Sequence, residues 1–301
     1  MLAKGTIIGN PTFIAVFTLL NVAVLLQPVQ EQMIKFVPQS VSEPVVNFTY
    51  VTGVTPLTEI KYPISFCCFY LILIFTLQAW MKNRSPWNLD VLRISHNFLL
   101  CFGSMLMMFG MAKGTFLVFQ KYGEEALFCD ANVRQKEGHL YFWYYVFFLS
   151  KFYEFIDTII LVLRKKDLTF LHVFHHFITA ILCWVALYNE IPVQWLVCIL
   201  NATVHIFMYY YYLATTLNSD VWWKKYLTTA QIIQFVVDLL GISVWWYYYL
   251  VKEQPCTGTV ASMLFVYFVL GSFLILFVLF YIKTFKRPAS GSRAPKAQKQ
   301  N

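Results

Sequence analysis

The stretch LTFLHVFHHFITAILCW, residues 168–184, has the apolar character of a membrane-spanning helix, yet it holds three of the six histidines of the chain. Its second half, FITAILCW, contains no charged residue. Histidine is costly in the hydrocarbon core of a membrane unless it has a partner or a chemical task there. The stretch therefore predicts a membrane helix with a polar end that carries chemistry and an apolar end that does not.

The same apolar character recurs along the rest of the chain. Of its 301 residues, 59% are hydrophobic and only 13% are charged, whereas about 25% are charged in a typical soluble domain. We therefore expect an all-α, polytopic membrane protein, a bundle of seven helices. About 20 helical residues cross roughly 30 Å of hydrocarbon. Seven runs have this length: residues 62–81, 94–119, 139–163, 170–189, 191–213, 226–250 and 258–282.

The chain divides into three parts. Residues 61–283 form the predicted membrane domain. Residues 1–60 form an N-terminal segment, in which the shorter apolar run 11–26 is left open as an extra span, an interfacial helix or a signal-like segment. Residues 284–301 are polar and basic and rich in Pro, Gly and Ser, which predicts a disordered tail.

Lysine and arginine gather on alternate connections between the predicted spans. One side of the membrane holds the connection 82–93, the run Arg164-Lys165-Lys166, the pair Lys224-Lys225 and the basic tail. The positive-inside rule places this side in the cytosol, so that the C-terminus is cytosolic and the N-terminal segment is lumenal. The formal net charge of +8 thus reflects topology first, and we expect no nucleic-acid partner.

The opposite side carries two features of an oxidising lumen. Cys129 and Cys256 lie in the two non-cytosolic loops, where a disulfide would join the second and third spans to the sixth and seventh, two free thiols being the alternative. The sequon NFT at Asn47 is also lumenal and is a candidate glycosylation site.

Polar side chains recur at one depth in four of the predicted spans. All lie in the cytosolic half or near the middle of the membrane, which predicts a polar cavity that opens to the cytosol. Within each span they follow the spacing of one helix face: Lys151, Glu154 and Asp157; His172, His175 and His176; Asn201, His205 and Tyr209; Gln231 and Gln234.

Several interpretations of these residues remain open at this point. Polar groups also hold membrane helices together, as Lys151 with Glu154 or the two glutamines would. His96 and His139 lie at span ends, where an interfacial histidine is ordinary. Metal binding at the HxxHH motif together with His205 is one chemistry, as in membrane desaturases and hydroxylases. Metal-free acid–base and acyl-transfer chemistry by histidine is the other, and we expect no metal.

Four motifs in order give a more specific indication: KFYEFIDT (151–158), HVFHH (172–176), NATVHIFMYYYY (201–212) and TTAQIIQ (228–234). Together they resemble the very-long-chain fatty acid elongase family, the ELO-type 3-ketoacyl-CoA synthases of the endoplasmic reticulum. The similarity extends over about residues 55–290.

The resemblance implies a reaction and its partners. A 3-oxoacyl-CoA synthase condenses a long-chain acyl-CoA with malonyl-CoA, releases CO2 and CoA, and adds two carbons without a cofactor. The fold would enclose a narrow acyl tunnel open to the cytosol, in a multi-pass protein of the endoplasmic reticulum membrane surrounded by membrane lipid. Elongation-cycle reductases and a dehydratase would be its partners, and a homodimer is left open. A metal-dependent lipid desaturase or hydroxylase, or a seven-helix receptor or transporter, is the alternative.

The residues fit this reaction as follows. His175 or His205 would take the acyl group or act as base, and the other, with His172 and His176, would stabilise the enolate. Asp157 and Glu154 would orient the histidines by hydrogen bonding, and Asn201 with Gln234 would form an oxyanion hole. Acyl length would depend on side-chain bulk at the lumenal ends of the spans, with a lean to saturated and monounsaturated chains. The remaining predicted substrate contacts are Lys151, Tyr209 and Gln231, with Arg164, Lys165, Lys166, Lys224 and Lys225 at the phosphates of CoA.

Overall fold

The computed structural model describes residues 45, 47–136 and 138–286, so the run 11–26 and the end of the tail lie outside the described residues. The described chain is helical and contains no strand. Its main helices are α4 (Lys61–Met81), α5 (Asp90–Tyr122), α7 (His139–Tyr153), α8 (Phe155–Leu163), α9 (Phe170–Tyr188), α10 (Gln194–Thr216), α11 (Lys224–Leu250) and α12 (Val260–Tyr281). Short turns form α6 (Glu125–Phe128), η1 (Arg134–Lys136) and η2 (Ile282–Lys286).

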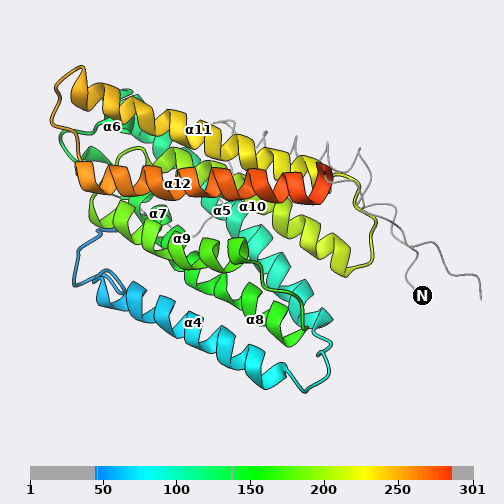
Figure 1. The fold of residues 1–301 in the computed structure, drawn as a ribbon. Helices are drawn as coiled ribbons and strands as arrows, with labels where there is room; N and C mark the ends of the chain where they lie inside the picture. Colours follow the sequence, from blue (N-terminus) through cyan, green and yellow to red (C-terminus); the bar gives the residue numbers. More distant parts are fainter. Residues whose placement is uncertain (1–44, 46, 137, 287–301) are drawn as a thin grey trace, which may run out of the picture.

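The long helices form one bundle of roughly parallel and antiparallel rods (Figure 1). Helix α5 packs along α10, α11 along α12, and α4 along α8 and α9. Six helices in the described part of the chain are long and apolar enough to cross a membrane. The all-α, multi-pass architecture expected from the sequence is therefore confirmed.

The third predicted span, residues 139–163, differs from the expectation of one continuous helix. It consists of α7 and α8, which meet at Glu154. At this point the Asp157 N–H donates to the Glu154 carbonyl at 3.0 Å, a hydrogen bond to the third preceding residue instead of the fourth. The two pieces together have the length of a seventh crossing.

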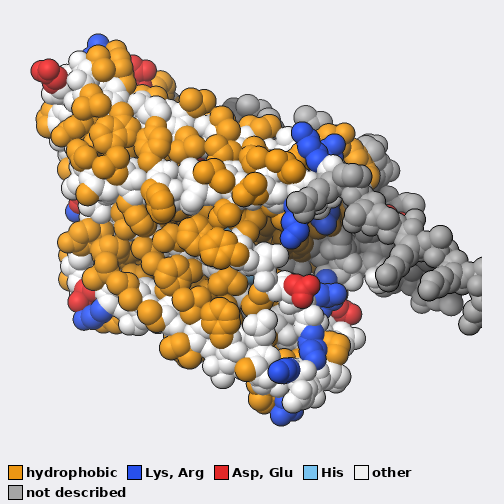
Figure 2. All heavy atoms as spheres, in the orientation of Figure 1, with side chains coloured by type: hydrophobic (Ala, Val, Ile, Leu, Met, Phe, Trp, Pro, Cys, Tyr) orange, Lys and Arg blue, Asp and Glu red, His pale blue; other side chains and the backbone are white. Residues whose placement is uncertain are grey.

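The surface of the bundle has an apolar middle and charged ends. Figure 2 shows hydrophobic side chains over the middle of one face, with Lys and Arg gathered at the end where α12 ends and α4 connects to α5. Exposed residues on the rods include Phe69, Ile72, Phe268 and Ile275. On a multi-pass membrane protein such side chains face lipid.

The end of the bundle opposite the basic residues is cross-linked. Cys129, which follows α6, and Cys256, which precedes α12, form a disulfide. The Cys129 carbonyl also accepts hydrogen bonds from the Thr257 N–H at 2.9 Å and from the Thr257 hydroxyl at 3.2 Å. The α11–α12 pair is thereby tied to the end of α5, as the sequence predicted. Asn47, the candidate glycosylation site, is exposed.

Two glycines set the distance between α5 and α7. A Cβ atom on Gly114 would lie 2.9 Å from the Leu140 Cα, and one on Gly110 would overlap the Trp143 indole. The absence of side chains at these positions lets α7 pack closely on α5. The contact involves the first turn of α7, at the opposite end of this helix from Lys151.

Candidate active site

A cavity of about 390 Å³, here called the polar cavity, receives residues from all four predicted sets. It is lined by Glu154 and Asp157, by the three histidines of α9, by residues of α10 and by both glutamines of α11. It also reaches the basic ends of the helices, because Arg93, Arg164 and Lys224 line it. The structure thus brings together the groups that the sequence placed at one depth.

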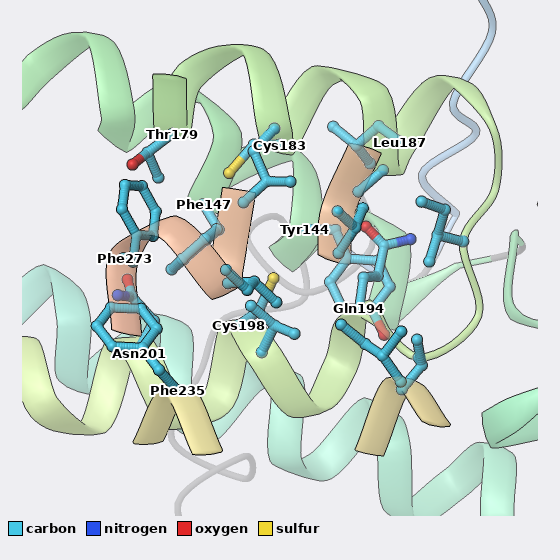
Figure 3. Close-up of a pocket in the computed structure, with 18 of the residues that line it drawn as sticks. Tyr144, Phe147, Thr179, Cys183, Leu187, Gln194, Cys198, Asn201, Phe235 and Phe273 are labelled. Carbon is cyan, nitrogen blue, oxygen red and sulfur yellow. The ribbon is translucent and has the colours of Figure 1, made fainter. Parts of the chain in front are cut away.

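A second cavity, here called the narrow cavity, has a volume of about 50 Å³ and a mostly apolar lining. In Figure 3, Thr179, Cys183 and Leu187 of α9 face side chains of α10 across it, and Phe273 closes one side. It extends toward the end of the bundle that carries the disulfide, where Ile191 lines it.

The two cavities meet at four residues. His175, Asn201, Gln234 and Phe235 line both of them. The His175 ring lies 4.9 Å from the Phe273 ring, centroid to centroid. Of the predicted histidines, His175 alone lines both cavities, whereas His172, His176 and His205 line only the polar one. A group bound at His175 is therefore in reach of a polar space and an apolar space.

A buried ion pair supports one side of this junction. Lys151 and Glu154 are 1% and 2% exposed, and the Lys151 ammonium donates to Glu154 Oε1 at 2.8 Å. The ammonium also donates to Asn201 Oδ1 at 3.3 Å. Glu154 Oε1 lies 3.7 Å from His205 Nδ1. The pair therefore reaches two of the predicted catalytic side chains, although Lys151 itself lines neither cavity.

His172 and His176 form the part of the histidine cluster that lines only the polar cavity. Their rings lie 4.4 Å apart. His172 Nε2 shares a hydrogen bond of 2.9 Å with the Thr158 hydroxyl, which is also 2.9 Å from the Tyr70 hydroxyl of α4. Among the described residues, no group of three or more His, Cys, Asp or Glu side chains is arranged to hold a metal ion.

Asp157 has different partners from those predicted. It contacts no histidine of α9 by hydrogen bond. Instead, its Oδ1 lies 3.0 Å from His96 Nε2, and its Oδ2 accepts from the Tyr209 hydroxyl at 2.8 Å. The reason is the position of Asp157 on α8, which faces α5 and α10 at this level. Asp157 was expected to orient histidines by hydrogen bonding, and the histidine that it contacts is His96 of α5.

His96 was missed as a site residue because it lies near the start of its span. It is 2% exposed and lines the polar cavity together with Asn97. The two adjacent polar residues come directly before the apolar part of the span, and this pair is the signal that could have identified His96.

The predicted basic residues divide into two groups. Arg164 and Lys224 line the polar cavity, and so does Arg93, which the sequence analysis did not select. The Lys165 ammonium instead donates to the carbonyls of Lys82 and Arg84, at 3.0 and 2.9 Å. It therefore joins the connection after α8 to the connection between α4 and α5. Two further residues are exposed and line neither cavity: Lys166 and Lys225.

The chain is similar to known proteins over nearly all of the described bundle. The chain matches the model of the ELO family, described as the GNS1/SUR4 family, over residues 55–293. It is 43% identical to fatty acid elongase A of Dictyostelium discoideum over 251 residues, which cover 81% of this chain and 90% of that protein. It is 30% identical to very long chain fatty acid elongase 4 of Homo sapiens over 258 residues, covering 81% and 76% of the two chains.

Proposed function

Because this chain belongs to the ELO (GNS1/SUR4) family and has a role in fatty acid elongation, we propose that it catalyses the condensing step. The substrates are a long-chain acyl-CoA and malonyl-CoA, and the products are a 3-oxoacyl-CoA longer by two carbons, CO2 and CoA. The chain is then a very-long-chain 3-oxoacyl-CoA synthase that needs no cofactor beyond its two substrates.

The observation that carries this proposal is the junction of the two cavities at His175. An acyl thioester has a polar, anionic CoA part and an apolar tail, and it needs both kinds of space on either side of one reacting carbon. The narrow cavity extends along α9 from His175 to Leu187, twelve residues or about 18 Å of helix axis. This length is comparable with an extended long-chain acyl group.

We propose that the phosphates of CoA bind at the cytosolic end of the polar cavity. Arg93, Arg164 and Lys224 supply positive charge there, and guanidinium groups bind phosphate by paired hydrogen bonds. The Lys165 ammonium already donates hydrogen bonds to two backbone carbonyls. We therefore propose that Arg93, in place of Lys165, contacts the phosphates of CoA. Lys166 and Lys225 contribute through the long-range field at the mouth.

The first proposed step is acyl transfer to His175. A ring nitrogen attacks the thioester carbonyl, the C–S bond breaks, and the CoA thiolate leaves with a proton. Malonyl-CoA then binds, and its carboxylate leaves as CO2. The electron pair of the broken C–C bond forms an enolate, which attacks the acyl carbonyl and releases His175. The overall reaction consumes one proton, and this proton ends on the thiol of the released CoA.

The neighbouring groups have supporting roles in this proposal. His205, beside Glu154, acts as the base or proton carrier. His172 and His176 stabilise the enolate from the cytosolic side. Asn201 and Gln234 line the junction and are placed to donate hydrogen bonds to the oxyanion. Tyr209 and Gln231 line the polar cavity as substrate contacts.

Activity of the purified, full-length chain tests the proposal. In liposomes with palmitoyl-CoA and carbon-labelled malonyl-CoA, we expect labelled 3-oxoacyl-CoA. Without malonyl-CoA, mass spectrometry should find an acyl group on His175. His175→Ala should abolish both signals, whereas His139→Ala, a histidine that lines neither cavity, should retain them. Absence of condensation by the wild type, or full activity of His175→Ala, would contradict the proposal. Stoichiometric iron or zinc with fatty-acid oxidation would favour the desaturase or hydroxylase alternative.

The setting of the enzyme follows from the same chemistry. We place it in the endoplasmic reticulum membrane with a cytosolic C-terminus, since CoA thioesters are cytosolic and the disulfide needs an oxidising lumen. Its 3-oxo product must be reduced, dehydrated and reduced again, which makes the reductases and dehydratase of the cycle its functional partners. Glycosylation of Asn47 and self-association as a homodimer are the further proposals for this setting.

A further inference from the structure

Asp238 is a buried carboxyl that the proposed reaction does not yet use. It lies on α11, fourteen residues or about 21 Å along the axis from Lys224 at the cytosolic end. Its side chain is 0% exposed. An ionisable residue at this depth in a membrane protein is expensive and is retained for a task or a specific partner.

The partner of Asp238 is an amide at the junction. Gln234 Nε2 donates to Asp238 Oδ2 at 3.2 Å, one helical turn away. Asp238 Oδ1 has no hydrogen-bond partner among the described residues. Asp238 lines neither cavity, whereas Gln234 lines both. Asp238 therefore stands behind Gln234, on the side away from the reacting group.

The second amide at the junction is held in a matching way. The Lys151 ammonium donates to Asn201 Oδ1 at 3.3 Å. An ammonium can only donate, so it fixes the amide oxygen toward Lys151 and leaves the Asn201 N–H groups for the junction. One N–H of Gln234 is likewise taken by Asp238, and the other remains. A buried, ionisable side chain thus holds each amide on the side away from the junction. The basic Lys151 holds Asn201, and the acidic Asp238 holds Gln234.

We propose that Asp238 is a positioning residue that holds the Gln234 amide as an oxyanion donor beside His175. This inference rests on the proposed condensation reaction. The terminal torsion of a glutamine is broad, so an unsupported amide samples orientations that point no N–H at the oxyanion. Removing an oxyanion donor lowers kcat by about 10²–10³-fold. Loss of a residue that orients such a group costs about 10–100-fold.

The test is a set of variants of the full-length enzyme in liposomes, assayed with palmitoyl-CoA and malonyl-CoA. Asp238→Ala should lower kcat by about 10–100-fold with little change in either KM, because the interaction acts on the transition state. Asp238→Asn should rescue, since its amide oxygen accepts the same hydrogen bond. Gln234→Leu should lower kcat further. The double variant Gln234→Leu/Asp238→Ala should equal Gln234→Leu, because Asp238 acts only through Gln234.

Val269→Ala is the matched control for the loss of buried atoms. Val269 is 0% exposed and belongs to the apolar cluster that α9, α11 and α12 form. It lines neither cavity. It should lower thermal stability and leave kcat of the folded fraction unchanged. A kcat of Asp238→Ala within about threefold of wild type, or a double variant whose losses multiply, would overturn the inference. A wild type without condensation activity would overturn the proposed function itself, and this inference with it.

Discussion

Lys151→Met should destabilise the protein strongly, because it removes one partner of a fully buried ion pair. Lys151 and Glu154 are 1% and 2% exposed, with 2.8 Å between the ammonium and the carboxylate. Methionine keeps most of the lysine stem, so the loss is one of charge and hydrogen bonding. Breaking such a pair costs about 3–5 kcal/mol, since the other charge stays buried.

We expect the free-energy loss of Lys151→Met to lie at the lower end of that range. Glu154 keeps the hydrogen bond from the Ser150 hydroxyl at 3.3 Å, so its carboxylate is not left without a partner. We therefore expect a loss of about 3 kcal/mol. At about 2–4 °C per kcal/mol for a chain of this size, Tm in detergent should fall by about 6–12 °C.

A double variant and a control sharpen the measurement. Lys151→Met/Glu154→Gln removes the orphaned charge and should recover most of the lost Tm. Lys113→Met, a lysine of α5 that forms no ion pair with a described carboxylate, should change Tm by no more than about 2 °C. If Lys151→Met behaves like Lys113→Met, the Lys151–Glu154 pair is solvated and the burial argument fails.

Three further predictions concern other parts of the molecule. Cys256→Ser should lower the free energy of unfolding by about 4 kcal/mol in urea titration, because the disulfide joins residues 127 positions apart. Cys68→Ser, at an exposed free cysteine, should have no effect. Equal stability of the two variants would refute a stabilising role of the disulfide. Ala186→Phe fills the narrow cavity and should shift the products to shorter chains in fatty-acid profiling, whereas an unchanged profile would exclude this cavity as the acyl site. His96→Ala removes the partner of Asp157 and should lower kcat by about tenfold, and an unaltered kcat would reduce His96 to a packing residue.

The amino-acid sequence predicted the fold well because membrane helices are set by long apolar runs. The helix ends fall within a few residues of the expected spans, since Lys, Arg and loop residues mark the membrane boundaries. The interruption of the third span at Glu154 was not predictable, because nothing in KFYEFIDT breaks a helix by composition. It depends on the local bonding of α8 against its neighbours.

The site was predictable in depth but less so in its pairings. The spacing of HVFHH and of Asn201 with His205 places side chains on one helix face, and all of them line the polar cavity. Which neighbour each side chain meets depends on how a helix is rotated about its axis, and apolar residues all round a membrane helix give little sign of that. Asp157 therefore met His96 instead of the α9 histidines, and Asp238 escaped notice as a single acid outside the motifs.

The disulfide between Cys129 and Cys256 also governs where the bundle can open. A covalent link at one end of a helix pair acts as a pivot, so the least costly way to separate the helices is rotation about that end. Helix α11 has 27 residues, or about 40 Å of length, so a tilt of about 5° moves its far end by about 3.5 Å. The linked α11–α12 pair is thus held at its disulfide end, and its largest displacement occurs at the opposite end, where Lys224 lines the polar cavity.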